Sequence, residues 1–366
     1  MTDLPLNLPP TSICIMRLSA IGDICHTLPV VRTLQAQWPQ TRITWIIGKL
    51  EATLVGDIPD IEFIVYNKSE GSQAARQLRQ KLADRRFDVL LHMQASLRAS
   101  RLIRHINADI KLGFDRDRAR DWQWLFTTHR IAANPRSHVI DGLFGFAEAL
   151  GINERVMRWD IPISAADKAF ASQHITESNG ALIISPCSSQ RARNFRNWRS
   201  EYYARVIDHA HKQHGLQAIL TGGPTELERE YGRAIAEQSK ADVTNLIGQT
   251  NLKQLFALIN RSAAVLAPDS GPIHMATAAG TPAIGLFASS NPLRTGPLDQ
   301  RWLVNRYPEA LKEDCGKTIE QARWGQRVRD PKVMDRIMPD EVCARIDDMA
   351  AHVQLPHAQR AAKDQT

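Results

Sequence analysis

Near residue 270 the sequence combines residue types that suit the binding of an anion. The segment follows an apolar run that ends in a proline, and it reads Asp269-Ser270-Gly271-Pro272-Ile273-His274. A helix that begins at Ser270 or Gly271 accepts Pro272 in its first turn, where no amide hydrogen is needed. The first amides of such a helix lack intrahelical partners and favour a phosphate, which Ser270 and His274 would also contact. A second interpretation stays open, in which Asp269 and Ser270 cap the helix and His274 is a packed imidazole.

A carboxylate in a second loop is a candidate base. Asp23 follows the first apolar strand, in a loop that also contains Gly22 and His26. Gly22 permits a tight turn, and Asp23 comes directly before the expected helix, where an acidic side chain is also an ordinary cap. From these residues alone, Asp23 is either a helix cap or a base that removes a proton from a substrate.

Residues 188–198 combine hydroxyl and cationic side chains after the first strand of the second half of the chain. The stretch contains two serines and three arginines, Ser188, Ser189, Arg191, Arg193 and Arg196. An arginine engages a phosphate with a bidentate fork. The sequence leaves open which arginine does so, and it also leaves open a basic surface loop whose tryptophan, Trp198, packs under the next helix.

The elements that position these loops are apolar runs that alternate with helical patterns. In the first half we expect strands at residues 12–18, 43–47, 63–66 and 87–93, and helices at 27–37, 74–85, 97–106 and 138–150. In the second half we expect strands at residues 181–185, 217–221, 243–247, 263–267 and 283–287, with helices that begin near 200, 225, 252 and 271. This alternation predicts two consecutive α/β domains, each with a doubly wound parallel sheet. Ligands of such sheets lie beyond the carboxyl ends of the strands, so a substrate that spans both domains would lie in a cleft between them.

Composition limits the class of protein further. The chain has 366 residues, of which 43% are hydrophobic and 23% charged, as in ordinary globular proteins. Its five cysteines form no CxxC pair, which favours a reducing compartment over a zinc ribbon or a disulfide framework. No signal peptide and no apolar run of about 20 residues is legible. The net charge of +7 suits anionic partners, but no nucleic-acid-binding module is recognisable.

Two common nucleotide-binding fingerprints are missing from the sequence. Neither half carries G-x-G-x-x-G after its first strand, and G-x-x-x-x-G-K-[ST] does not occur. Dinucleotide binding and P-loop hydrolysis are therefore poorly supported, and a nucleotide must be held in another way.

Taken together, three motifs resemble glycosyltransferase family 9, the ADP-heptose:lipopolysaccharide heptosyltransferases. They are the loop Ser19-Ala20-Ile21-Gly22-Asp23-Ile24-Cys25-His26-Thr27-Leu28-Pro29, the strand start Phe87-Asp88-Val89, and Asp269 to His274. The similarity covers roughly residues 12–300. It implies the GT-B fold, in which two Rossmann-like domains face each other across a cleft and a C-terminal helix crosses back to the first domain. We accordingly expect an acceptor-binding domain at 1–165, a nucleotide-sugar-binding domain at 166–335, and a final segment at 336–366 whose helix spans about Asp340–Val353.

The resemblance also implies a reaction. Heptose would be transferred with inversion from ADP-L-glycero-D-manno-heptose to a Kdo residue of the lipopolysaccharide inner core, with Asp23 as general base. Arg196 and Trp198 stand where family members commonly have lysine and tryptophan, so Arg196 is the expected catalytic cation at the departing diphosphate. No metal or other cofactor is expected to take part.

Further site residues follow from the resemblance alone. The donor would contact Ser188, Ser189, Arg196, Glu226, Thr250, Asp269, Ser270, Gly271, Pro272 and His274. The acceptor would contact Gly22, His26, Arg98 and Arg101, with more arginines following at Arg116, Arg118 and Arg120. For Glu226 and for each acceptor-side arginine, an ordinary solvated side chain is the alternative interpretation.

The expected partners are the ADP-heptose donor, the lipid A-Kdo acceptor and an anionic membrane surface, with no nucleic acid. We expect a cytoplasmic monomer that associates peripherally with the inner membrane. Two alternatives remain at this stage. One is a family 9 enzyme with another sugar donor or acceptor, and the other is a non-catalytic protein that binds a nucleotide sugar.

Overall fold

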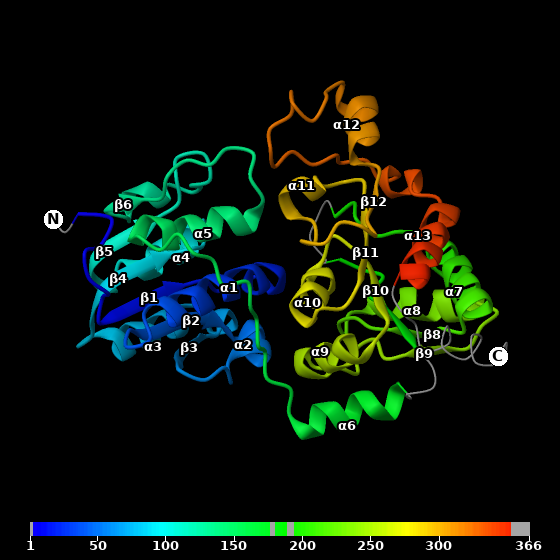
Figure 1. The fold of residues 1–366 in the computed structure, drawn as a ribbon, viewed down its shortest axis with the longest axis horizontal. Helices are drawn as coiled ribbons and strands as arrows, with labels where there is room; N and C mark the ends of the chain where they lie inside the picture. Colours follow the sequence, from blue (N-terminus) through cyan, green and yellow to red (C-terminus); the bar gives the residue numbers. More distant parts are fainter. Residues whose placement is uncertain (1–2, 176–179, 189–193, 353–366) are drawn as a thin grey trace. The chain divides into compact units, whose positions relative to one another are not determined.

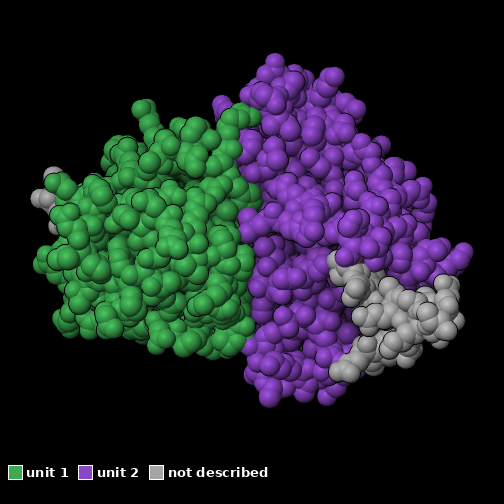
Figure 2. All heavy atoms as spheres, viewed as in Figure 1, with its two compact units in different colours: residues 1–162 green, residues 163–366 purple. Residues whose placement is uncertain are grey.

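A computed structural model describes residues 3–175, 180–188 and 194–352. The chain divides into two compact units, Met1–Pro162 and Ile163–Thr366, which Figure 2 shows in different colours. Each unit contains a six-stranded sheet whose strands are all parallel, with helices packed against it (Figure 1). The expected α/β class with two Rossmann-like domains is therefore confirmed.

The first sheet has the strand order β3-β2-β1-β4-β5-β6. Its strands are β1 (Ser12–Met16), β2 (Arg42–Gly48), β3 (Ile61–Tyr66), β4 (Arg86–His92), β5 (Asn107–Gly113) and β6 (His129–Arg130). The helices of this unit are α1 (Ile21–Gln37), α2 (Lys49–Val55), α3 (Ser72–Leu82), α4 (Leu97–Ile103) and α5 (Val139–Leu150), with short 3-10 turns η1 (Lys68–Glu70) and η2 (Gln123–Leu125). Every residue of β1 is buried, as expected for a central parallel strand that is covered on both faces.

Alternate side chains of β1 enter different cores, because successive residues of a strand point to opposite faces. Cys14 and Met16 pack in one cluster with Leu78 of α3 and Leu102 of α4. On the other face, α1 packs against α5. The sheet is thus sandwiched between two helical layers, and its loops emerge at its edges.

The second sheet has the strand order β12-β11-β10-β7-β8-β9. Its strands are β7 (Ala181–Ile184), β8 (Gln217–Leu220), β9 (Val243–Asn245), β10 (Ala264–Pro268), β11 (Ala283–Phe287) and β12 (Val304–Asn305). The helices are α6 (Ala165–His174), α7 (Ser200–His214), α8 (Glu226–Gln238), α9 (Leu252–Arg261), α10 (Gly271–Ala279), α11 (Pro292–Thr295), α12 (Tyr307–Cys315) and α13 (Pro339–His352), with the 3-10 turn η3 (Val333–Arg336). Helices α7 and α13 pack together, and α9 contacts both α6 and α10.

Helix α13 belongs to the core of the second unit. Its apolar residues Val342, Ile346 and Met349 are buried in the same cluster as the strands β7 and β10. The helix contacts α7, β11 and β12. The observed division falls after Pro162, whereas we expected it after residue 165. The expected return of the C-terminal helix to the first domain stays a prediction.

Each sheet has a point at which the direction of winding reverses. In the first unit the chain moves from β1 to β2 on one side and from β4 to β5 on the other, so the reversal lies between β1 and β4. In the second unit it lies between β10 and β7 for the same reason. The loops that follow adjacent strands diverge at these points and leave a crevice in which α/β proteins bind ligands. Both crevices receive loops that the sequence singled out.

Strand β5 was not expected from the sequence, and helix α1 starts earlier than we expected. Strand β5 carries Asn107, Asp109 and Lys111 among its seven residues, so it lacks the apolar run by which strands such as β1 were predicted. Helix α1 begins at Ile21, several residues before the expected start at residue 27. In the described part of the chain, no helix has the combination of length and apolarity that a membrane span requires.

Candidate functional site

Asp23 lies inside the first turn of α1 rather than before it. The helix N-cap is Ala20, and Asp23 is the third helical residue. Its Oδ2 atom accepts a hydrogen bond from the Ala20 amide at 3.2 Å. The expectation that Asp23 precedes the helix is therefore wrong, because the chain is already helical at Ile21 and Gly22. The carboxylate nevertheless stays accessible, with 37% of its side chain exposed.

Arg17, at the end of β1, pairs with this carboxylate. Its Nη2 atom lies 2.5 Å from Asp23 Oδ2, and its Nη1 atom donates to the carbonyl oxygen of Met93. Arg17 itself is buried. A buried guanidinium that is fixed at two points holds the partner carboxylate in one orientation. Sequence reasoning missed this role, although the position of Arg17 directly after a buried strand was a usable signal.

The end of β4 fastens the loop that carries Asp23. Gln94 accepts a hydrogen bond from the Leu18 amide at 2.6 Å and donates to Ser19 Oγ at 3.4 Å. Trp45, from β2, donates through its indole N–H to the Arg17 carbonyl at 3.0 Å. The loop is therefore tied to both strands that flank β1, which makes Asp23 a preorganised group.

His92 lies on the same edge of the sheet but is fully buried. Its Nε2 atom is 3.0 Å from Ser100 Oγ. Burial, reinforced by the positive charge of Arg17, lowers the pKa of His92 to about 3. The imidazole is thus neutral at physiological pH, and its role is to pack and hydrogen-bond rather than to carry charge.

The expected acceptor residues of the first unit have different environments. Gly22 lies in the first turn of α1, beside Asp23. His26 is buried, and its ring packs edge-on against His138 with 5.3 Å between centroids. Arg98 and Arg101 lie on α4 with exposed side chains. Of these residues, the structure brings only Gly22 next to the carboxylate.

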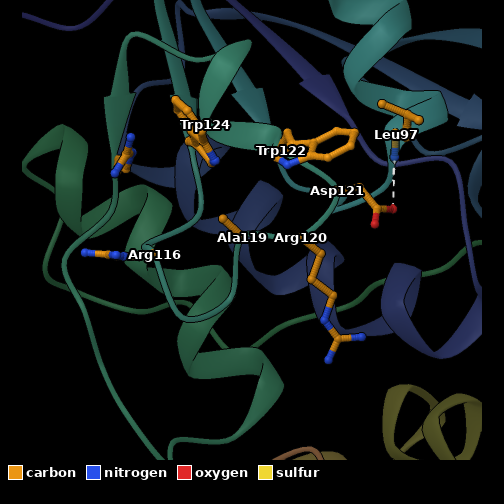
Figure 3. Close-up of a pocket in the computed structure, with 8 residues that line it drawn as sticks. Leu97, Arg116, Ala119, Arg120, Asp121, Trp122 and Trp124 are labelled. Atoms are coloured by element: carbon orange, nitrogen blue, oxygen red, sulfur yellow. Dashed lines mark hydrogen bonds between the residues drawn. The ribbon is translucent and has the colours of Figure 1, made fainter.

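A pocket of about 810 Å³ opens beside the start of α4. Its lining consists of Leu97, Arg116, Ala119, Arg120, Asp121, Trp122, Trp124 and Arg130. Figure 3 shows the two indole rings on one side of this pocket and the Arg116 and Arg120 side chains on the other. Three arginines against one aspartate give the pocket a positive charge, and two exposed indoles give it flat apolar surfaces. Such a surface suits an anionic carbohydrate. We expected Arg98 and Arg101 to be the main acceptor contacts on this side, yet neither lines the pocket.

The loop that forms this pocket is anchored from beneath. Arg118 pairs with the buried Asp115 at 2.6 Å and also contacts the Asn134 carbonyl and Ser137. Gln123 is buried and donates to the His92 carbonyl at 2.9 Å. Arg118 is thus a structural residue, and the neighbouring Arg116 and Arg120 remain directed at the pocket.

In the second unit, the start of α10 has the geometry of an anion site. Ser270 is the N-cap in extended conformation, but its hydroxyl donates to the Pro268 carbonyl at 3.0 Å and makes no capping bond to the helix. Pro272 occupies the first turn, as expected. The interpretation of Ser270 as a side-chain cap is therefore wrong. The first amides of α10, which begins at Gly271, carry no side-chain cap.

Arg196 lies at the start of this helix. Its Nη1 atom donates to the Asp269 carbonyl at 2.6 Å and lies 3.4 Å from the Asp269 carboxylate. Its Nε atom donates to Asn194 Oδ1 at 3.2 Å. Asp269 and His274 are both buried. A guanidinium and uncapped helix amides therefore occupy one region of the reversal point between β7 and β10.

A polar network supports Arg196 after β7. Ser188 is buried, and its hydroxyl donates a hydrogen bond to Asn194 Oδ1 at 2.8 Å. The Ser188 amide donates to Asn197 Oδ1 at 2.9 Å. The two asparagines were not singled out in the sequence, although their spacing around Arg196 was visible. Three expected candidates of this loop, Ser189, Arg191 and Arg193, lie outside the described residues.

The acidic residues at the start of α8 differ from the expectation. Glu226 is exposed and pairs with Arg233 at 2.8 Å. Glu228 instead turns toward the Gly222–Gly223 turn, where a Cβ atom on Gly223 would lie 2.6 Å from its Oε2. Burial raises the pKa of Glu228, while the Gly223 amide and the Thr225 side chain partly offset this rise. The pattern Thr225-x-x-Glu228, with the Glu228 amide donating to Thr225 Oγ at 3.4 Å, was the missed signal.

The remaining donor candidate, Thr250, lies in the loop between β9 and α9. It is half-buried and follows Gly248, which has a positive φ of 74°. The described residues of the second unit thus place Ser188, Arg196, Asp269, Ser270 and Gly271 together through direct bonds or adjacency, with Pro272 and His274 on the same helix. Glu226 and Thr250 follow other strands of the same sheet.

These arrangements define the chemistry that each unit supports. The first unit holds an oriented carboxylate at the reversal point of its sheet, which suits removal of a proton. The second unit holds a guanidinium beside uncapped helix amides, which suits a phosphate or diphosphate. A reaction that transfers a group from a phosphate leaving group to a hydroxyl needs both: a base for the hydroxyl and a positive site for the phosphate.

Comparison with known proteins gives concordant results. The family described as "Glycosyltransferase family 9 (heptosyltransferase)" matches residues 75–322. The lipopolysaccharide core heptosyltransferase OpsX of Haemophilus influenzae is 42% identical over 340 residues, which cover 92% of this chain and 96% of OpsX.

Solved structures show the same fold. A family 9 glycosyltransferase from Veillonella parvula superposes with a TM-score of 0.77 at 23% identity and covers 95% of this chain and 99% of its own. The E. coli heptosyltransferase WaaC with ADP has a TM-score of 0.71 at 17% identity, with 93% of this chain and 100% of WaaC covered. The resemblance expected from the three motifs is therefore confirmed, and the chain belongs to glycosyltransferase family 9, the heptosyltransferases.

Proposed function

We propose that this heptosyltransferase moves heptose from ADP-L-glycero-D-manno-heptose to a Kdo residue of the lipopolysaccharide inner core. The name of the relative OpsX supports the core lipopolysaccharide as acceptor, and the presence of ADP with WaaC supports an adenine nucleotide as donor. The observation that carries the proposal is the Arg196 guanidinium held against the uncapped start of α10. It gives the second unit a site for the diphosphate of such a donor.

In the proposed reaction, an acceptor hydroxyl oxygen attacks the anomeric carbon of the heptose. The bond between that carbon and the β-phosphate oxygen breaks, ADP departs with the electron pair, and the configuration is inverted. The hydroxyl proton passes to the Asp23 carboxylate. Because a sugar hydroxyl is a weak nucleophile, a base that is already oriented by Arg17 accelerates the attack.

Charge develops on the β-phosphate as ADP leaves. The Arg196 guanidinium and the first amides of α10 would stabilise that charge without rearranging. Arg196 is only 13% exposed in its side chain, so water screens it weakly. These groups supply positive charge from the chain itself, and we therefore expect transfer to proceed without an added metal ion.

Donor recognition would extend along the same edge of the second sheet. Ser188 holds the loop that carries Arg196, and His274 lies on the helix that binds the phosphates. A carboxylate at the start of α8 would bind the ribose hydroxyls, as acidic residues do in other nucleotide sites. The structure makes Glu228 a candidate beside Glu226, because Glu228 lies against the glycine turn while Glu226 pairs with Arg233.

The pocket beside α4 is the proposed acceptor site of the first unit. Kdo is a sugar acid, so its carboxylate would pair with Arg116, Arg120 or Arg130, and a sugar ring would stack on Trp122 or Trp124. The net positive charge of the chain would favour peripheral contact with the anionic membrane that holds a lipid-linked acceptor.

A transfer assay tests the proposal directly. The purified chain is incubated with Kdo-bearing lipid A and with ADP-heptose, and parallel reactions contain UDP- and GDP-sugars. We expect a heptosylated product, detected by mass spectrometry, from ADP-heptose alone. Activity only with another nucleotide sugar would favour a family 9 enzyme of different specificity, and binding without turnover of any donor would favour a non-catalytic protein.

A further inference from the structure

Three metal-ligating side chains converge on the second unit outside the transfer site. His209 and His214 lie on α7, and Asp347 lies on α13. The Nε2 atoms of the two histidines lie 2.7 Å and 2.6 Å from the same oxygen, Asp347 Oδ1. One ligand atom from each residue falls within 4.8 Å of the other two. The cluster therefore joins two helices at a single point.

We propose that His209, His214 and Asp347 bind one divalent transition-metal ion, with Zn²⁺ as the best fit, which links α7 to α13. Two imidazole nitrogens and one carboxylate oxygen form a donor set that suits Zn²⁺ in proteins, whereas Mg²⁺ and Ca²⁺ prefer oxygen ligands alone. Three protein ligands leave a fourth tetrahedral position for water. The 47% exposure of the Asp347 side chain gives that water access.

The geometry needs only a small adjustment. With bonds of about 2.0–2.1 Å, tetrahedral ligand atoms on zinc lie about 3.3 Å apart. The observed nitrogen-to-oxygen separations are 2.7 Å and 2.6 Å, so each of these two pairs must open by roughly 0.6–0.7 Å. Asp347 can supply this movement because it is part-exposed and sits on a single helix face. In the metal-bound form each imidazole would present an unprotonated Nε2 to the ion and carry its N–H on Nδ1.

The position of the cluster defines what the metal would do. Helix α13 is the last described element, and its residues Val342, Ile346 and Met349 complete the core of the second unit. A metal bridge to α7 would hold this helix in place, and so it would stabilise the unit. The ion pair alone would do so weakly, because part-exposed pairs contribute little in water.

This site is separate from the proposed transfer chemistry. The donor residues lie in loops that follow β7 and β10, whereas His209 and Asp347 project from the helices α7 and α13. The metal is therefore structural, and its loss leaves Arg196 and the start of α10 unchanged. Failure of the metal proposal and failure of the proposed transferase activity are consequently distinguishable.

Titration with Zn²⁺ tests the site. The full chain is first treated with a chelator and dialysed, and Zn²⁺ is then added in competition with a chromophoric chelator. We expect one high-affinity ion per chain, and at least about a tenfold loss of affinity in His209→Ala and in Asp347→Asn, since even indirect supports of a metal contribute that much. His211→Ala is the matched control, because His211 is an exposed histidine on the same helix, and we expect its affinity to be unchanged.

Two further measurements make the outcome decisive. Zn²⁺ at a hundredfold excess over its Kd should raise the Tm of the chain by about 5–10 °C, and the same Zn²⁺ concentration should raise the Tm of Asp347→Asn by about half as much or less. Co²⁺ should give visible absorption bands of a tetrahedral site that His209→Ala removes while His211→Ala retains them. Equal Zn²⁺ affinity in all variants, or no binding at micromolar concentrations, would overturn the proposal.

Discussion

Asp23 shows how the surroundings of a residue can suit it to the role of base that we propose for it. In the sequence it is an acidic residue near a helix start, which is a common structural arrangement. In the structure its carboxylate is held by Arg17 and the Ala20 amide while a third of the side chain stays exposed. An oriented and accessible carboxylate is what a general base requires.

Replacing Asp23 by asparagine tests this role. The amide keeps the size of the side chain but does not accept the proton, so we expect kcat to fall by at least about 10²-fold. The affinity for ADP, measured by calorimetry, should remain near that of the natural chain because the proposed donor residues lie in the other unit. Unchanged turnover would remove Asp23 from the mechanism.

Arg196 is the corresponding residue of the second unit. Hydrogen bonds to a charged group contribute about 1.5–3 kcal/mol, so Arg196→Ala should weaken ADP binding by about 10- to 100-fold. Arg199→Ala is a suitable control, because Arg199 is a nearby arginine that pairs with Asp335 on the surface. If ADP binds equally well to both variants, the phosphate contact belongs to another cation of the loop.

At the scale of elements, the loop between β5 and β6 carries the proposed acceptor specificity. Trp122 has a positive φ of 56° and a side chain that is 64% exposed, so nothing in the core explains its indole. We expect Trp122→Ala to raise KM for the Kdo acceptor by about fivefold, since loss of a stacking contact removes on the order of 1 kcal/mol. KM for ADP-heptose should not change. Trp38→Ala, at the C-terminal end of α1, is a control that also removes an indole, and an equal effect there would argue against the pocket.

His92, at the end of β4, should make the stability of the first unit depend on pH. Burial lowers the pKa of His92 to about 3, whereas an unfolded chain binds the proton near the ordinary value of about 6.5. The unfolded state therefore takes up more protons than the folded state below pH 6.5, and acid destabilises the first unit. The free energy of unfolding should fall by up to about 1.4 kcal/mol per pH unit between pH 6.5 and pH 3.

Urea unfolding at a series of pH values measures this dependence. His92→Gln keeps a hydrogen-bonding side chain that does not titrate, so its unfolding free energy should depend less steeply on pH in the same range. A parallel decline in both proteins would mean that other groups cause the acid sensitivity.

Some elements could be predicted from the sequence and others could not. Buried strands such as β1 and β10 were predictable because nearly all of their residues are apolar, and the loops after them located Asp23 and the start of α10. Strand β5 was not predictable, since polar residues alternate with apolar ones in a strand that pairs on both sides, with β4 and with β6. Contacts between distant segments, such as Arg17 with Met93 or Arg196 with Asp269, depend on strand order and have no local signature. From the sequence we named Glu226 and not Glu228, because only the structure shows that Glu228 lies against the glycine turn while Glu226 pairs with Arg233.

Because the molecule divides into two units, a ligand that binds one unit should stabilise that unit more than the other. ADP binds only the second unit in our proposal, so it should stabilise that unit without stabilising the first. At a hundredfold excess over its Kd, a ligand raises the free energy of unfolding by about 2.7 kcal/mol. Hydrogen exchange measured by mass spectrometry should show slower exchange in β7, β10 and α10.

The first unit is the internal control for this hydrogen-exchange experiment. Exchange in β1, β4 and α4 should remain as it is without nucleotide, because these elements have their own core. Protection that is confined to the first unit would contradict the assignment of the donor site to the second.

The anchoring of the pocket loop has a consequence for redesign. Arg118 and Gln123 fasten the loop to the body of the first unit, whereas Arg116, Arg120, Trp122 and Trp124 face the pocket. In our proposal, anchoring of the loop and recognition of the acceptor thus belong to different side chains of one segment. If so, an engineer could exchange the four pocket residues to change the acceptor and leave the anchoring residues, the proposed base and the proposed donor site in place.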